Sequence, residues 1–344
     1  MIRLSRYPFA LNSVLLAFAM LASLAIGAVF IPPASLLELL TSSIPGLGDH
    51  PIVSETFRTI LFSIRLPHTI LMALTGAALG TSGAAYQGLF QNPLADPYLI
   101  GVASGAGLGA VVAMSYHWPD NPFGFLVIPS AAFLGGLITV GVVYALARSG
   151  GTIPTTTLIL AGVAVGSFAS AMTTFLMFRS EGEVRRALAW LLGGATQSGW
   201  QPVIAGIPYL VLGTGILLTS GHALNVLQFG DDQAHQLGLP VYRAKATVII
   251  AATLTTAAAV AFTGIIGFIG LIIPHVIRII WGPDYRKLIP LSLISGATAL
   301  LIADLLARVL LAPQQLPVGV ITALAGAPFF LWVLRRYQRS AGRL

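Results

Sequence analysis

The sequence predicts an all-α integral membrane protein with ten transmembrane helices and both chain ends in the cytoplasm. Three observations support this prediction. Of the 344 residues, 56% are hydrophobic and 8% are charged, whereas soluble domains usually carry about a quarter charged residues. The apolar residues form stretches long enough to cross a bilayer. The basic residues between these stretches are unequally divided between the two sides.

Each predicted span is an apolar stretch of roughly 18–25 residues that ends at a turn or a charge cluster. The first is longer than the apolar region of a signal peptide, which has roughly 7–15 residues, so we expect a retained helix. The eighth is short and abuts the seventh, which makes that boundary the hardest to place. The ten spans are residues 8–31, 66–90, 98–115, 125–147, 155–178, 202–221, 244–262, 264–281, 288–311 and 318–337.

The orientation follows from the 18 Lys and Arg residues, because the lipid headgroup field favours basic loops on the cytoplasmic side. With the N-terminus inside, 12 of the 18 lie in inner segments and 6 in outer segments. An even number of spans then places the C-terminus inside as well. We therefore expect residues 1–344 to form a single transmembrane domain in the inner membrane, in contact with lipid.

No motif in the sequence indicates catalysis. The chain has no cysteine, and it contains no GxxxxGK[ST] phosphate loop, HExxH zinc helix or GxSxG nucleophile turn. Its six histidines are scattered without metal-ligand spacing. We expect no catalytic residue, metal site or bound cofactor. Basic tracts with interleaved aromatics are also missing, so nucleic acid is not an expected partner. An integral membrane enzyme remains an alternative without a supporting motif.

An ion-coupled secondary carrier is a second alternative, because ionisable groups inside a bilayer are costly and usually functional. Asp304 is the candidate, in "LLIADLLARVLL". Arg308 follows it by four residues on the same helical face and pairs with it locally. A single acid that is already paired is weak support for ion coupling. A transporter that draws its energy from a separate protein instead needs a cytoplasmic surface to receive that energy.

The polar segment "GDDQAHQLGLPVYRAK", residues 230–245, lies between the sixth and seventh spans and is a candidate for that surface. Its acids come first, where the helix dipole favours negative charge, and Gly238 is a natural helix stop. A short helix that docks into a groove of a partner also needs an apolar anchor. Ala234, Leu237 and Leu239 are the expected anchors.

Several longer motifs together resemble the FecCD family, the permease subunits of type II ABC importers. They are "RLPHTILMALTGAALGTSGAAYQGLFQNPLADPYLIGVASGAGLG", "PTTTLILAGVAVG", "GDDQAHQLGLP", "GFIGLIIPHVIRIIWGPDYRKLIPLSLISGATALLIADLLAR" and "LPVGVITALAGAPFFLWVL". The resemblance implies a homodimer of ten-helix permeases, a periplasmic or lipid-anchored substrate-binding protein, and two separate ATPase subunits that bind ATP and Mg²⁺. It implies import of a metal chelate, with iron siderophores first and cobalamin or haem next.

The resemblance also implies roles for particular residues. Coupling helices that dock the ATPase fall at about 223–243, cytoplasmic gates after the second span and before the fifth, and an outer gating helix at 180–194. Cobalamin-type importers carry two arginines, three residues apart, that receive the binding protein; here the second is a histidine. The coupling residues are Gly230, Asp231, Asp232, Ala234, Leu237, Gly238 and Leu239; the gates Asn92, Leu94, Thr155 and Thr156; the binding-protein docking residues Arg65, His68 and Arg308.

Overall fold

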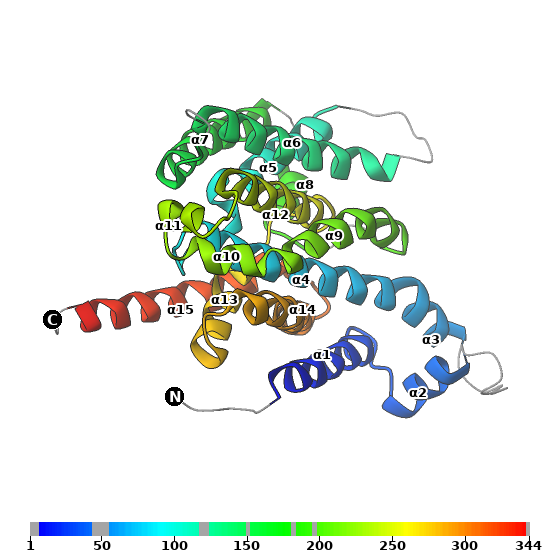
Figure 1. The fold of residues 1–344 in the computed structure, drawn as a ribbon. Helices are drawn as coiled ribbons and strands as arrows, with labels where there is room; N and C mark the ends of the chain where they lie inside the picture. Colours follow the sequence, from blue (N-terminus) through cyan, green and yellow to red (C-terminus); the bar gives the residue numbers. More distant parts are fainter. Residues whose placement is uncertain are drawn as a thin grey trace.

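The fold was analysed in a computed structural model, which describes residues 7–42, 55–116, 124–148, 152–179, 184–194 and 198–341. Every regular element in these ranges is a helix (Figure 1). The elements are α1 (Pro8–Ala25), α2 (Pro33–Ser42), α3 (Glu55–Thr59), the π-helical η1 (Ile60–Arg65), α4 (Leu66–Leu89), the 3₁₀-helical η2 (Pro97–Ile100), α5 (Val102–Met114), α6 (Gly124–Ala147), α7 (Thr155–Arg179), α8 (Val184–Leu191), α9 (Gln201–Thr219), α10 (Gly221–Leu227), α11 (Asp231–Gln236), α12 (Val241–Thr263), α13 (Ile269–Trp281), α14 (Tyr285–Val309) and α15 (Val318–Ala341).

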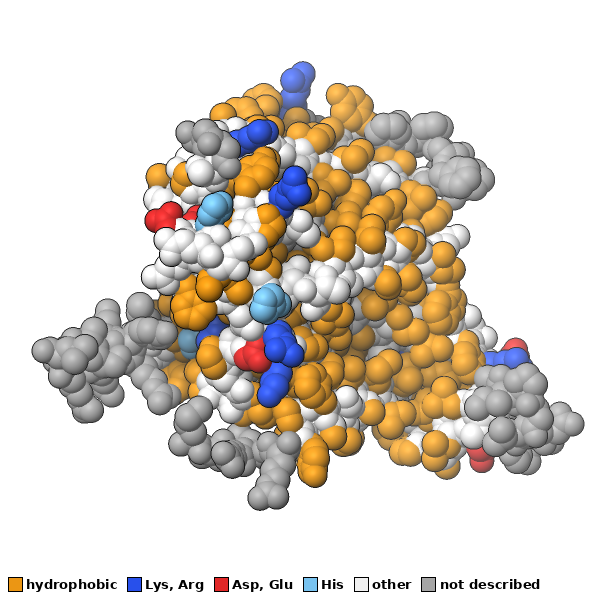
Figure 2. Space-filling view, viewed as in Figure 1, with side chains coloured by type: hydrophobic (Ala, Val, Ile, Leu, Met, Phe, Trp, Pro, Cys, Tyr) orange, Lys and Arg blue, Asp and Glu red, His pale blue; other side chains and the backbone are white. Residues whose placement is uncertain are grey.

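The apolar helices confirm that this is a multi-pass membrane protein. In the described residues, seven helical stretches are long and apolar enough to cross a bilayer, and three shorter apolar helices accompany them: α5, α13 and the 318–333 part of α15. These ten stretches lie on the ten predicted segments. Charged side chains gather towards the ends of the molecule in the view of Figure 2, and a broad apolar surface lies between them, as expected for a surface in contact with lipid.

Two elements differ from the sequence prediction. The helix predicted over 66–90 begins at Glu55, because α3, η1 and α4 run on as one helix through a π-helical turn. The short helix α2 was not predicted, and it buries Leu36 and Leu39 against the N-terminal part of the chain. Both segments mix polar and apolar residues, which hides them from a search for uniformly apolar stretches.

Helix α4 is the centre of the bundle and contacts α14, α12, α13 and α9. Small residues allow it to approach α14 closely: a Cβ added at Gly76 would lie 2.3 Å from the carbonyl oxygen of Gly296, and one added at Gly296 would lie 2.3 Å from that of Gly76. Helices in lipid associate through such close backbone contacts rather than by exclusion from water. The glycine-rich stretches therefore set the spacing of the core helices.

A short non-helical stretch separates the seventh and eighth predicted spans. Helix α12 ends at Thr263 and α13 begins at Ile269, and Gly264 and Phe268 both have positive φ. Irregular backbone at membrane depth is tolerated only when protein covers it. Tyr98 supplies part of that cover, because its hydroxyl donates to the Ile266 carbonyl at 2.9 Å.

Figure 1 shows that α1 begins and α15 ends at the same end of the bundle, where α10 and α11 also lie. The α2–α3 region lies at the opposite end. We call the first end, with α10 and α11, the coupling end, and the second the distal end. The two ends carry different candidate sites.

Candidate functional site

Two short helices, α10 and α11, lie at the coupling end, in the region of about 223–243 that was expected to hold the coupling helices. Gly230, at φ +94°, separates them. Gly238, at φ +85°, ends α11, and Leu239 N–H donates to the Ala234 carbonyl at 3.0 Å, as in a glycine-terminated helix end. The predicted stop at Gly238 is confirmed, and so is the position of both acids in the first turn.

The two acids of α11 have different surroundings. Asp231 accepts a hydrogen bond from Lys245 Nζ at 2.6 Å, and the Lys245 side chain is only 5% exposed whereas that of Asp231 is 49% exposed. A buried ammonium needs a partner charge, so Asp231 ties α11 to the first turns of α12. Asp232 is exposed. Only Asp232 is thus directed away from the chain's own core.

The apolar residues of the segment divide in the same way. Ala234 is fully buried in the chain's core and Leu239 packs against that core, so Ala234 is not available as an anchor for a partner; this expectation was wrong. A helix of six residues has one inner face, and Ala234 occupies it. Leu237 is 67% exposed, and Phe229, which the sequence reasoning missed, is 63% exposed. These two side chains are the exposed apolar groups of the segment.

Helix α10 is fixed to the start of α14 by one asparagine. Asn225 donates to Asp284 Oδ1 at 2.7 Å and accepts from the Tyr285 backbone N–H at 2.9 Å. The hydrogen bond from Asn225, supported by the Arg286 N–H, holds the pKa of Asp284 below its usual value. The carboxylate of Asp284 therefore stays ionised and caps α14, because its Oδ1 also accepts from the Arg286 N–H at 3.0 Å.

The predicted gate residues lie on two neighbouring segments. Asn92 and Leu94 belong to the loop after α4, in which Asn92 Oδ1 accepts from the Leu94 N–H at 3.0 Å. Thr155 and Thr156 open α7 and are half-buried and exposed, respectively. Helix α7 contacts η2, which follows the Asn92 loop directly. The gate assignment stays a prediction.

A groove runs along α7 that the sequence reasoning missed. One cavity of about 690 Å³ lies between α5, α7 and α8, and a second of about 550 Å³ continues from it towards the Asn92 loop; they share Ser104 and Ser170. The walls carry hydroxyls and apolar groups, and Asp96 is the one charged residue among the lining residues that the structure describes. The sequence signal is the small and hydroxyl-bearing residues of "GVASGAGLGAVVA" and "AGVAVGSFASA".

Asp96 lies at the end of this groove that is nearer the Asn92 loop, and it directly precedes η2. Its Oδ1 accepts from the Tyr98 N–H at 2.8 Å, which caps the helix. Burial raises the pKa of Asp96 to about 6, and the hydrogen bond from Tyr98 opposes that rise. The groove therefore ends, near neutral pH, in a carboxylate that is partly deprived of water.

Helix α8 covers the other end of the groove. The predicted amphipathic segment over 180–194 is confirmed over Val184–Leu191; residues 180–183 lie outside the described part of the chain. Ala187 and Trp190 face inward, while Arg185 and Arg186 are exposed. An amphipathic helix of this kind lies across the end of the groove rather than through the membrane.

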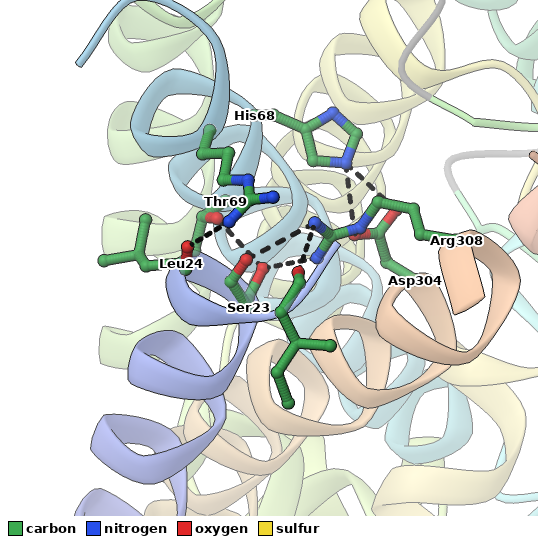
Figure 3. Close-up of polar contacts among 8 residues, drawn as sticks. Ser23, Leu24, His68, Thr69, Asp304 and Arg308 are labelled. Carbon is green, nitrogen blue, oxygen red and sulfur yellow. Dashed lines mark hydrogen bonds and ion pairs between the residues drawn. The ribbon is translucent and has the colours of Figure 1, made fainter. Parts of the chain in front are cut away.

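The predicted docking residues meet near the distal end in one polar cluster (Figure 3). Asp304 lies between His68 and Arg308: His68 Nε2 lies 3.0 Å from Asp304 Oδ1, and Arg308 Nε 2.9 Å from Asp304 Oδ2. Arg308 also donates to Ser23 Oγ at 2.7 Å, and Ser23 Oγ lies 2.9 Å from Thr69 Oγ1. The predicted Asp304–Arg308 pair is confirmed, and His68 is a partner that helical spacing could not indicate.

Both arginines bind the C-terminal end of α1. Arg65, only 7% exposed, donates to the carbonyls of Leu24 at 2.8 Å, Ala25 at 3.0 Å and Val29. Arg308 donates to the carbonyls of Ser23 and Ile26. Cations at a helix C-terminus satisfy its free carbonyls and complement its dipole. Arg65 and Arg308 thus hold α1 in place, and their docking to a binding protein stays a prediction.

This fold is that of a helical membrane permease with a polar loop at one end. The sequence profile of the FecCD transport family matches residues 15–336, and the chain belongs to that family. It is 46% identical to the cobalamin import system permease protein of Halobacterium salinarum over 284 residues, which is 82% of this chain and 75% of that protein. It is 39% identical to the hemin transport system permease protein of Yersinia pestis over 327 residues, 89% of this chain and 96% of that protein.

The fold also matches a solved structure, described as an inward-facing conformation of a metal-chelate type ABC transporter. The TM-score is 0.79 at 28% sequence identity, and the match covers 95% of this chain and 98% of that one. The chain is therefore a multi-pass permease of the inner membrane, of the ABC transporter type.

Proposed function

We propose that this chain is the transmembrane subunit of a binding-protein-dependent importer that carries a metal chelate inward. Two copies would form the passage, each with ten spans and both termini in the cytoplasm. Two ATPase subunits would dock on α10 and α11, and a substrate-binding protein would deliver cargo at the distal end. The chain itself performs no chemistry; its gates change arrangement when its partners change state.

The observation that carries this proposal is one polar stretch of an otherwise apolar chain, residues 221–245, which includes α10 and α11 and which we call the docking segment. Leu237 and Phe229 are exposed apolar residues on either side of α11, which lies at the coupling end in Figure 1. Asp232 supplies an exposed charge in the same part of the chain. Exposed apolar anchors with a polar rim are typical of helix-in-groove contacts between proteins. A self-sufficient carrier would have no use for such a surface.

The groove along α7 supports a bulky, weakly held cargo. Its walls are hydroxyls and small apolar groups, so they can guide a large molecule without binding it tightly. Relatives of this chain are named for cobalamin and for hemin, which are both metal chelates of a large planar ring. We therefore favour cobalamin, then haem, over the ferric siderophores that the resemblance had placed first.

Uptake in proteoliposomes tests the proposal. The permease would be reconstituted with its ATPase and binding protein, and uptake of labelled cobalamin, hemin and a ferric hydroxamate siderophore compared with and without ATP inside. ATP-dependent uptake of one chelate is the expected result. Accumulation without the ATPase, driven by a proton gradient, would instead favour the carrier centred on Asp304.

A further inference from the structure

Two glutamines join the docking segment directly to the loop that carries the predicted gate. Gln91 follows α4 and Gln228 follows α10. The Gln91 side-chain amide donates to the Leu227 carbonyl, at the end of α10. The Gln228 side-chain amide donates to the Gly88 carbonyl, in the last turn of α4, at 2.9 Å. Each helix end is thus capped by the glutamine that follows the other helix.

Such reciprocal bonds are not needed by either helix alone. The last carbonyls of a helix lack intrahelical partners, and water or the next turn can satisfy them at an exposed loop. Here the two bonds join residues that are far apart in the sequence. Gln228 and Gly88 are 140 residues apart, and Gln91 and Leu227 are 136 residues apart. The two bonds therefore hold the end of α4 to the end of α10, a contact that neither helix needs in order to form.

The backbone of Gln91 gives independent support. Its φ is +51°, in the left-handed region that a glycine adopts without cost. A side chain retained at such a position needs a reason beyond the turn itself. The bond to Leu227 supplies one, because glycine at residue 91 would make the same turn without it.

The gate loop has contacts and space that fit a moving part. Gln91 and Gln228 line one polar cavity of about 280 Å³ together with Asn92, His275 and Arg278. Among the described cavity-lining residues, Gln87 Oε1 is buried without a hydrogen-bond partner, and His275 forms a hydrogen bond with the backbone of Pro93 in the gate loop. The loop is therefore held to α10 by Gln91 and borders this cavity, in which His275 holds it to α13.

We propose that Gln91 and Gln228 form a clamp that carries movement of the ATPase-docking helices to the gate loop at Asn92. The inference rests on the proposed function, and both glutamines act as positioning residues rather than as contacts for cargo. When α10 moves with a docked ATPase, the bond to Gly88 and the bond from Gln91 move the end of α4 and the gate loop with it. Without the clamp, ATP hydrolysis and gate movement become separate events.

The test uses the complete assembly in proteoliposomes, measuring ATP hydrolysis and chelate uptake in the same sample. Gln91→Gly removes the side chain and keeps the turn. Gln228→Ala removes the bond to Gly88 together with a bond that Gln228 donates to the Leu224 carbonyl within α10. Each should leave ATPase association and hydrolysis unchanged but raise the ATP consumed per chelate by up to roughly tenfold, because each removes one of the two hydrogen bonds that join the segments. The double variant should be no worse than either single one. Gln201→Ala, an exposed glutamine at the start of α9, is the matched control and should behave as the unaltered protein.

A cross-link distinguishes coupling from mere stabilisation. The chain has no cysteine, so Gln91→Cys with Gln228→Cys can be joined by a short bismaleimide without background reaction at this subunit. The unlinked pair should be uncoupled, and the linked pair should recover transport. Failure of the link to restore transport, or an unchanged ATP-to-chelate ratio in the single variants, would overturn the clamp. If the unaltered assembly shows no ATP-dependent uptake, the proposed function fails instead.

Discussion

Replacing Asp231 by Asn should destabilise the coupling end, whereas the same change at the adjacent Asp232 should not. Asp231 is the partner of Lys245, whose side chain is 5% exposed. Removing one member of a buried ion pair costs about 3–5 kcal/mol. Because the Asp231 carboxylate is 49% exposed and therefore screened by solvent, we expect about 1–3 kcal/mol here.

The assay is thermal unfolding of the purified permease in nanodiscs, followed by loss of helical signal. A loss of about 1–3 kcal/mol corresponds to a decrease of several degrees in Tm for a chain of this size. Asp231→Asn combined with Lys245→Met should recover most of the loss, because it removes the unpaired charge together with its partner. Asp232→Asn is the matched control.

Two results would refute this reasoning. Equal Tm values for the Asp231 and Asp232 variants would mean that the ion pair does not hold α11 to α12. Failure of Lys245→Met to rescue Asp231→Asn would mean that the carboxylate acts through another contact. Co-purification with the ATPase separates the two roles: Asp232→Lys should weaken association at unchanged Tm, since Asp232 and Leu237 are both exposed.

Three further predictions address packing, pH and docking. Gly76→Ala should destabilise the protein by about 1–3 kcal/mol, because its Cβ would lie 2.3 Å from a backbone oxygen of α14. Gly141→Ala, with no atom within 4 Å of the added Cβ, should be neutral in the same unfolding assay. Because folding raises the pKa of the Asp96 carboxyl from 3.8 to about 6, the protein loses stability as the pH rises through this range. Asp96→Asn should therefore raise Tm at pH 7.5 by the equivalent of up to about 3 kcal/mol and give no gain at pH 3.5. Leu237→Asp should reduce co-purification with the ATPase at unchanged Tm, whereas Ala234→Asp, at a fully buried position, should unfold the segment.

The membrane helices could be predicted from the sequence because their boundaries depend on a local property. An apolar stretch must cover the bilayer whatever its neighbours are, so hydropathy alone located α6 and α7 to within one residue of each end. The π-helical turn before α4 and the short α2 depend on contacts with the rest of the chain. No local composition encodes those contacts, so both elements were missed.

For the docking segment, the sequence predicts the position of the helix but not the directions of its side chains. Polarity located the segment, and helix-capping rules correctly placed the acids and the stop at Gly238. The direction of each side chain depends on which face the six-residue helix turns to the core, and Ala234 was assigned to the wrong face. The Gln91 and Gln228 bonds are beyond reach for a related reason, since both acceptors are backbone carbonyls of distant segments and leave no trace in residue type.

Asp304 illustrates how a distant contact changes a functional argument. It is the one acid within the ten predicted spans, which made it the candidate for ion coupling. Helical spacing supplied one partner, Arg308, but the structure adds His68 from a segment 236 residues away. With Arg308 on one carboxylate oxygen and His68 within hydrogen-bond distance of both, Asp304 is held in an ion pair that also fixes the end of α1 through Ser23. A proton-coupling acid must gain and lose its proton in each cycle, and doing so here would break the contacts that hold three helices together. The geometry therefore favours an energy source outside the bilayer.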